Sequence, residues 1–343
     1  MTIDDPGAGR RRPAHLSRRS RRRWRSSAAV AVLSAAWLAA LPARAAPAAV
    51  ADGVYVLRDS FLPGQQPDGN SVIFAGPDGL VVVDTGRHIA HAQALLDFAA
   101  ARRQPIVAVV NTHWHLDHLG GNGLLRDGTP GLRVIASTAV APALAGWLAA
   151  SRRDMQALVD SGRADATTQA MIRIDIALID LGPKLLPDLA LEGPRRLDLA
   201  GRPLEIGLAT RAVTAGDLWV FDPRTRTLAV GDLVTLPVPF LDTACTAGWQ
   251  AALRGIDALP FERLVPGHGA PMDRAGFATW RRAFEGLLVC AAGTGPASGC
   301  AEGWINTLGD LLPTTQHGLA RGMIGDYFED PLRAPPAQRD RHC

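Results

Sequence analysis

Short apolar runs, each bounded by glycine, proline or polar residues, recur along the first half of the chain. They lie at 53–58, 71–74, 80–83, 106–110 and 133–136. Runs of this kind predict strands, whereas the alanines and leucines at 91–103 follow the spacing of a helix face. The first half therefore predicts a sheet with a helix between its third and fourth strands.

The second half repeats this pattern. Its predicted strands lie at 197–199, 204–208, 218–221, 227–230 and 263–265. Helices are predicted at 246–259, 273–290, 301–312 and 318–328. Strands and helices that occur twice in this order predict an α/β fold of the αββα type, a four-layer sandwich of two sheets between outer helices.

Two helical patterns, at 138–158 and 165–181, separate the halves and form a predicted insertion that reaches residue 191. Thr138 is the predicted N-cap of the first of these helices. Two roles stay open for the insertion, shaping a substrate pocket or packing alone. We expect a main domain over 51–285 and a cysteine-containing C-terminal extension over 286–343.

The first 45 residues differ in composition from the rest. They hold ten of the 36 basic residues and two of the 33 acidic ones, so residues 46–343 carry a formal charge of −5. The arginine-rich start, the apolar run at 28–41 and the sequence Ala43-Arg44-Ala45 predict a signal peptide over 1–45. We expect a periplasmic or secreted protein, exported by the general or the twin-arginine route, without a stable membrane span after cleavage.

The acidic body has no basic stripe, which argues against a nucleic-acid partner. An exported chain with four cysteines favours two disulfides, for which three pairings exist. Cys290 and Cys300 are close enough in sequence to close a small loop, which leaves Cys245 for Cys343.

Residues 111–122 read N-T-H-W-H-L-D-H-L-G-G-N and directly follow a predicted strand. Four of them are potential metal ligands, namely His113, His115, Asp117 and His118. Imidazoles and a carboxylate at this density favour zinc, with iron or manganese as alternatives. We therefore expect one or two zinc ions here, beside a tight glycine turn at Gly120 and Gly121.

The pattern T-H-x-H-x-D-H-x-G-G resembles the signature of the metallo-β-lactamase superfamily, the αββα metallohydrolases. Further family motifs follow in order, D-T-G at 84–86, G-D at 231–232 and G-H-G at 267–269. The resemblance implies a two-metal site, with His113 and His115 in the first site, Asp117, His118 and His268 in the second, and Asp232 as the bridge. It also places Asp84 beside the metals.

One position departs from the family pattern. Where the family has H-T-x-G-D, this chain has Val213 at the position of the histidine. Three interpretations stay open: only the second site is filled, both are filled with water or substrate completing the first, or His88 or His317 substitutes.

The resemblance implies a small-molecule hydrolase that attacks an ester, thioester, lactone or amide with a metal-bound hydroxide held by Asp117. Thr85, Thr214 and Asp217 are candidates for orienting the ligands through hydrogen bonds. His88, Trp114 and Asn122 are candidates for lining the pocket. β-Lactam hydrolysis, or a non-catalytic metal- or ligand-binding protein, is the alternative.

Within the superfamily, the fuller resemblance is to periplasmic zinc metallohydrolases associated with quinoprotein dehydrogenase systems. It rests on the order of D-T-G, H-x-H-x-D-H and G-D-L-V-x-x-P in an exported chain.

Overall fold

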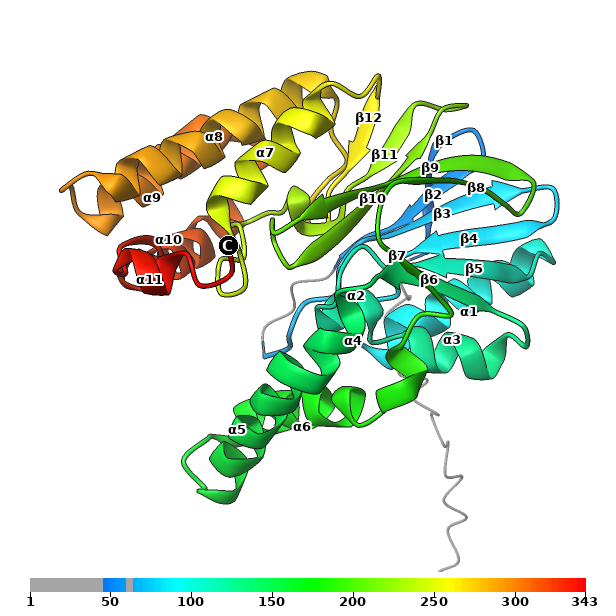
Figure 1. The fold of residues 1–343 in the computed structure, drawn as a ribbon, viewed down its shortest axis with the longest axis horizontal. Coiled ribbons are helices and arrows are strands. Elements are labelled where there is room, and N and C mark those ends of the chain that lie inside the picture. The colour runs from blue at the N-terminus through cyan, green and yellow to red at the C-terminus, as the bar shows by residue number, and fades with distance from the viewer. Residues whose placement is uncertain (1–45, 60–63) are drawn as a thin grey trace, which may run out of the picture. The chain divides into compact units, whose positions relative to one another are not determined.

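The computed structural model describes residues 46–59 and 64–343, which belong to one compact unit (Figure 1). The predicted signal peptide, 1–45, lies outside the described residues. Within the described part of the chain, no helix is both long and apolar enough to cross a bilayer.

A seven-stranded sheet is formed by the first half of the chain. Its strands, in spatial order, are β1 (Ala48–Ala51), β2 (Val54–Leu57), β3 (Ser71–Gly76), β4 (Gly79–Val83), β5 (Ile106–Val110), β6 (Arg133–Ser137) and β7 (Leu189–Leu191). Neighbours are antiparallel from β1 to β4 and parallel from β4 to β7. All predicted strands of this half are present, and the short strands β1 and β7 were not predicted.

The second half forms a five-stranded sheet in the order β12-β11-β10-β9-β8. The bounds are β8 (Arg195–Leu199), β9 (Arg202–Thr210), β10 (Gly216–Asp222), β11 (Thr227–Ala229) and β12 (Arg263–Val265). Only the contact between β11 and β12 is parallel. This sheet matches the predicted strands.

Alternation along β4 shows how the layers are built. Val81 and Val83 belong to the core between the two sheets, whereas Leu80 and Val82 pack with residues of α1 (Ile89–Arg102) on the outer face. Successive side chains of a strand point to opposite faces, so one apolar strand stabilises both layers. Helices α7 (Thr246–Asp257) and α8 (Arg274–Ala292) cover the second sheet (Figure 1). The predicted αββα sandwich is thereby confirmed.

Arg202, at the start of β9, joins the two sheets. Its guanidinium donates to the carbonyls of Gly53 (3.0 Å) and Ala75 (2.9 Å) in the first sheet and to the carboxylate of Asp222 (2.5 Å) in the second. The side chains of both Arg202 and Asp222 are at most 2% exposed. A buried ion pair of this kind is strongly destabilised by loss of one partner.

The insertion differs in detail from its prediction. Its first helix begins at Val140 with Ala139 as the N-cap, and Thr138 precedes the helix, where its N–H donates to the carbonyl of Leu191 at the end of β7. The N-cap prediction at Thr138 is therefore wrong. The helical segments are α4 (Val140–Ala143), a π-helical turn (Leu144–Leu148), α5 (Ala149–Asp160) and α6 (Ala166–Ile179).

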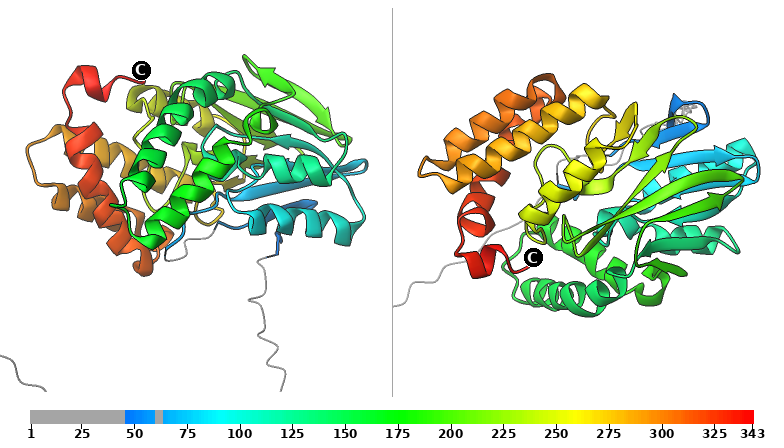
Figure 2. Two further views of the ribbon diagram at one scale, coloured as in Figure 1. Left: turned by 90° about the horizontal axis from the view of Figure 1, so that it is seen from below. Right: turned by 45° about the horizontal axis from the view of Figure 1, so that its top comes forward.

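The C-terminal region is helical, with α9 (Ala297–Leu308), α10 (His317–Tyr327) and α11 (Pro336–Arg339). Both predicted disulfides, Cys245–Cys343 and Cys290–Cys300, are confirmed. Figure 2 shows the insertion and these helices at the same end of the sandwich. The boundary proposed at 285/286 stays a prediction, although α8 and α9 share one apolar core.

Candidate metal centre

The loop after β5 presents the candidate ligands. Buried amides fix it: Asn111 donates to the carbonyl of His118 (3.0 Å), and Asn122 donates to the side-chain oxygen of Asn111 (2.7 Å). Gly120 and Gly121 have ordinary helical φ angles of −60° and −73°. A Cβ on Gly121 would lie 2.3 Å from the carbonyl oxygen of Thr85. Close backbone contact, and not an unusual turn, therefore explains the glycine.

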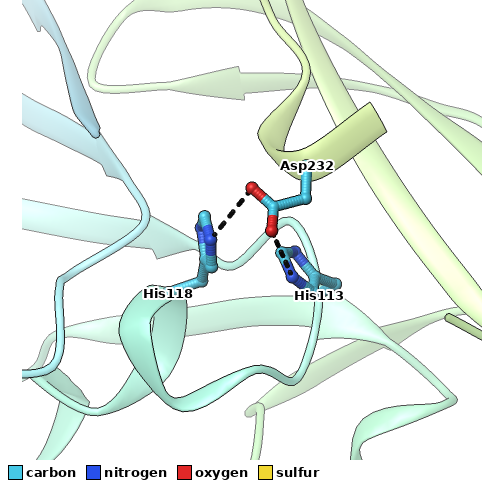
Figure 3. A group of neighbouring side chains, drawn as sticks. All are labelled: His113, His118 and Asp232. Atoms are coloured by element: carbon cyan, nitrogen blue, oxygen red, sulfur yellow. Dashed lines mark ion pairs between the residues drawn. The ribbon is translucent and has the colours of Figure 1, made fainter. Parts of the chain in front are cut away.

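Six polar side chains meet at the edge of the sandwich. In the first group, Asp232 Oδ2 lies 3.7 Å from His113 Nε2 and Asp232 Oδ1 lies 3.3 Å from His118 Nε2 (Figure 3). In the second, Asp117 Oδ2 lies 3.0 Å from His268 Nε2 and 3.7 Å from His118 Nε2. Asp232 Oδ1 is also 3.6 Å from His268 Nε2. His118 and Asp232 thus lie between the outer ligands.

His115 lies beside the first group. Its Nδ1 is 2.9 Å from His113 Nε2, and its Nε2 is 3.0 Å from the hydroxyl of Thr243. That hydroxyl donates to the carbonyl of Val213 (3.0 Å), so it accepts from His115 Nε2–H. The lone pair of His115 is therefore on Nδ1 and faces His113. Nothing in the sequence around Thr243 indicated this contact, because a single threonine carries no pattern.

His113 and His118 are also oriented by a hydrogen bond to one ring nitrogen, which leaves the other nitrogen facing the site. Thr112 donates its hydroxyl to Asp84 (2.7 Å) and so accepts from His113 Nδ1 (3.0 Å). His118 Nδ1 donates to Asp84 Oδ2 (2.8 Å). A carboxylate behind a histidine in this way fixes the tautomer of a metal ligand. Asp84 thus takes the place beside the ligands that the resemblance implied, and Thr85 bonds the carbonyl of His118 (3.2 Å).

Burial and charge set the protonation of the site. Burial lowers the pKa of His113 well below its usual value and that of His115 to about 4, so both rings are neutral at pH 7. Burial disfavours the anion of Asp117, but His118, His268 and Arg87 outweigh it and hold the pKa well below the usual range. His113, His115 and Asp117 therefore have the protonation states that bind metals. Burial disfavours the charged rings of His118 and His268, but Asp232 and Asp117 outweigh it and raise the pKa of each, so these two rings would release a proton on metal binding.

The residues present fit a metal ion. The ring nitrogens His113 Nε2 and His115 Nδ1 lie 2.9 Å apart. In the tautomers described above neither nitrogen carries a proton, so two lone pairs face each other. His118 Nε2 and Asp232 Oδ1 are buried and have no hydrogen-bond partner among the described residues. Such an arrangement is unfavourable unless a cation satisfies it. Nitrogen and carboxylate donors suit zinc.

Val213 is buried in the apolar core, and neither suggested substitute reaches the site. His88 Nδ1 bonds to Asp68 (3.0 Å), and His317 Nε2 bonds to the carbonyl of Leu312 (3.2 Å). Neither histidine belongs to a ligand group among the described residues. The interpretation that a distant histidine replaces the missing ligand is therefore wrong.

Thr214 and Asp217 bond to each other (2.9 Å) and stiffen the loop that carries Val213. Their hydrogen bonds do not extend to a candidate ligand in the described structure, so the predicted orienting role is not direct. Burial raises the pKa of Asp217 to about 7.

A cavity of about 500 Å³ opens over the site. Trp114 lines it together with His115, Asp117, Asp232 and His268. Asn122 is fully buried in the loop network, and His88 points to Asp68, so these two predicted lining residues lie outside the cavity walls. Arg87 lines the cavity, bonds to Asp175 of α6, and places Nη2 3.6 Å from Asp117 Oδ1.

Three tryptophans hold the wall that follows Asp232. The indole N–H groups of Trp249, Trp280 and Trp304 donate to the carbonyls of Leu233 (3.0 Å), Thr235 (2.9 Å) and Pro237 (2.8 Å). Buried carbonyls need such partners. The tryptophans come from α7, α8 and α9, so the C-terminal helices help to position Asp232.

This chain combines an αββα sandwich with buried histidines and aspartates at the sandwich edge. These two features together place it in the class of αββα metallohydrolases. The profile of the Metallo-beta-lactamase superfamily matches residues 65–268, more than half of the chain. The chain belongs to this superfamily.

Known relatives are distant. An (R)-specific secondary-alkylsulfatase of a Pseudomonas species is 28% identical over 186 residues, 48% of this chain and 27% of that protein. A linear primary-alkylsulfatase of a Pseudomonas species is 38% identical over 74 residues, 21% of this chain and 10% of that protein. A metallo-beta-lactamase from Pontibacter korlensis matches with a TM-score of 0.52 at 20% identity, covering 70% of this chain and 98% of that chain. At this identity the structural likeness shows the fold alone.

We expect Thr243→Val to weaken zinc binding about 10- to 100-fold, the size of effect seen when a residue behind a metal ligand is lost. Valine keeps the shape but removes the hydroxyl that orients His115. The measurement is competition for zinc with a chelator of known affinity. Thr243→Ser, which keeps the hydroxyl, is the matched control and retains the affinity. Equal affinities of the valine and serine variants would show that His115 does not hold the metal.

Proposed function

We propose that this chain is an exported hydrolase that binds one or two zinc ions and cleaves an ester, thioester, lactone or amide bond. The proposed ligands are His113, His115, Asp117, His118, Asp232 and His268. The observation that carries the proposal is the set of inward ring nitrogens of His113, His115 and His118, which lie beside two ionised carboxylates that line a cavity.

When bound, zinc lowers the pKa of a water molecule toward about 7 and polarises the attacked oxygen. Asp117 contributes from the cavity wall. Its Oδ2 faces the ligand group, while Oδ1 faces Arg87 at 3.6 Å. Its low pKa keeps the carboxylate ionised at neutral pH, so it would accept a hydrogen bond from the attacking water and orient it, while the water proton passes to the leaving group.

A sulfate ester is the second candidate substrate, favoured by the 186-residue similarity to the secondary-alkylsulfatase. The chain spans 27% of the length of that protein, so this activity is a proposal only. The two disulfides support export, because such bonds persist in oxidising compartments. Membership of the quinoprotein-associated subgroup stays a proposal that rests on the motif order.

The test is hydrolysis by purified, zinc-loaded protein of a panel that contains an ester, a thioester, a lactone, an amide, a cephalosporin and a secondary alkyl sulfate. We expect turnover of a member of the panel that is lost on removing zinc with a chelator and returns with added zinc. Failure to retain zinc would contradict the proposal. Retained zinc with no turnover of any substrate would instead favour a non-catalytic binding protein.

A further inference from the structure

The cavity above the candidate metal centre has a largely apolar lining. Its apolar lining comes from four separate parts of the chain. These side chains are Trp114, Leu116, Trp147, Leu148, Met155, Ile179, Leu236, Pro237, Val238, Phe240, Leu319 and Met323. Because His115, Asp117, Asp232 and His268 line the same cavity, an apolar chamber leads to the reacting groups.

Two of its lining residues leave large apolar surface in water. Trp147 of the insertion is 41% exposed and Leu319 of α10 is 45% exposed. Only Ile89, Ile174 and Val289 are comparable among the described residues, and none of these three lines the cavity. Exposed apolar side chains that gather at one opening, instead of lying scattered, mark a binding surface.

The backbone beneath Trp147 is unusual. This residue lies in the π-helical turn Leu144–Leu148, and such turns occur frequently at functional sites. The indole of Trp147 packs against that of Trp114 (centroids 5.0 Å apart), and Trp114 packs edge-on against His115 (4.7 Å). Phe240 contacts the other side of His115 (4.9 Å). An aromatic surface therefore continues from the opening to a candidate ligand.

Charge in the cavity does not favour an anionic tail. Arg87 is the one arginine or lysine among its lining residues in the described structure, and it already pairs with Asp175. Asp117 lies 3.6 Å from the same guanidinium. The lining therefore offers mainly apolar contact and no cation that is free to pair with an anionic tail.

We infer that the cavity binds a hydrocarbon group, an alkyl chain or an aryl ring, of an ester whose scissile bond lies beside Asp117 and His268. This inference rests on the proposed hydrolase function and names its substrate class. The insertion and α10 form the two sides of the opening, which assigns them a role in substrate recognition.

The first test is a series of 4-nitrophenyl esters from acetate to decanoate. Each methylene group buried in the cavity raises kcat/KM about fourfold until the cavity is full. Leu319→Gln and Trp147→Gln flatten this dependence on chain length. Val289→Gln, which changes an exposed valine of α8 outside the cavity, is the matched control and retains it.

The second test does not require hydrolysis. Calorimetric titration with 1-hexanol, 1-octanol and 1-decanol should show affinity that rises with chain length, and Leu319→Gln should abolish the trend. If the alcohols bind in this way but no ester is hydrolysed, the inference stands and the proposed function fails. If esters are hydrolysed without dependence on chain length and the alcohols do not bind, the inference is overturned and the hydrolase function stands.

Discussion

Replacing Asp117 with alanine should lower kcat by at least about a thousandfold, because in the proposed mechanism this one carboxylate both binds the metal and orients the attacking water. The geometry gives the reason. Asp117 Oδ2 lies 3.0 Å from His268 Nε2 and 3.7 Å from His118 Nε2, and the side chain lines the cavity. Asp84 cannot take both roles, since it bonds Thr112 and His118 from behind.

The measurement is steady-state hydrolysis together with the zinc content of each variant. Asp154→Ala changes an exposed aspartate of α5 and serves as the control, with unchanged activity and zinc content. Activity of Asp117→Ala within about tenfold of the wild type would contradict the catalytic role, because that corresponds to about 1.4 kcal/mol of lost transition-state stabilisation. Full zinc content with lost activity would separate the catalytic role of Asp117 from its role as a ligand.

The sequence itself brings some of the candidate ligands together. His113, His115, Asp117 and His118 fall in one loop after one strand, so they lie close together without any long-range contact. Asp232 and His268 follow other strands, and local pattern alone could not bring them to this loop. Their selection depended on the family resemblance, and the structure places both beside His118.

Contacts made between distant loops could not be predicted. Thr243 meets His115 only in the folded chain, where the same hydroxyl also donates to the carbonyl of Val213. The carbonyls of Leu233, Thr235 and Pro237 face three indoles from three helices, an arrangement that no sequence period encodes. Strand β1 was missed because its residues are mostly alanine, which is a weak strand former.

Val213 acquires a different meaning from these contacts. The backbone carbonyl of Val213, which stands where the family pattern has histidine, accepts a hydrogen bond from Thr243, which in turn orients His115. The ring nitrogens His113 Nε2 and His115 Nδ1 are therefore held in place although residue 213 is not a ligand. This order favours a first site that water or substrate completes over one that never binds metal, and zinc stoichiometry would distinguish the two.

Replacing Arg202 with methionine should lower the free energy of unfolding by about 3–5 kcal/mol, the loss expected when one partner of a buried ion pair is removed. Methionine leaves the buried carboxylate of Asp222 without its cation and removes the guanidinium donor from the carbonyls of Gly53 and Ala75. The measurement is denaturant-induced unfolding followed by circular dichroism. Arg196→Met, an exposed arginine in β8, is the matched control and should change stability by less than about 0.5 kcal/mol.

The pH dependence tests the cause. Burial disfavours the anion of Asp222, but the bonds from Arg202 and Thr225 outweigh it and lower its pKa in the folded state. A lowered carboxyl pKa stabilises the fold above the unfolded value of about 4, and this stabilisation is lost as the pH falls through the folded value. The difference between the wild type and Arg202→Met should therefore shrink from about pH 7 to about pH 3. A difference that is constant with pH would assign the loss to the carbonyl contacts instead of the ion pair.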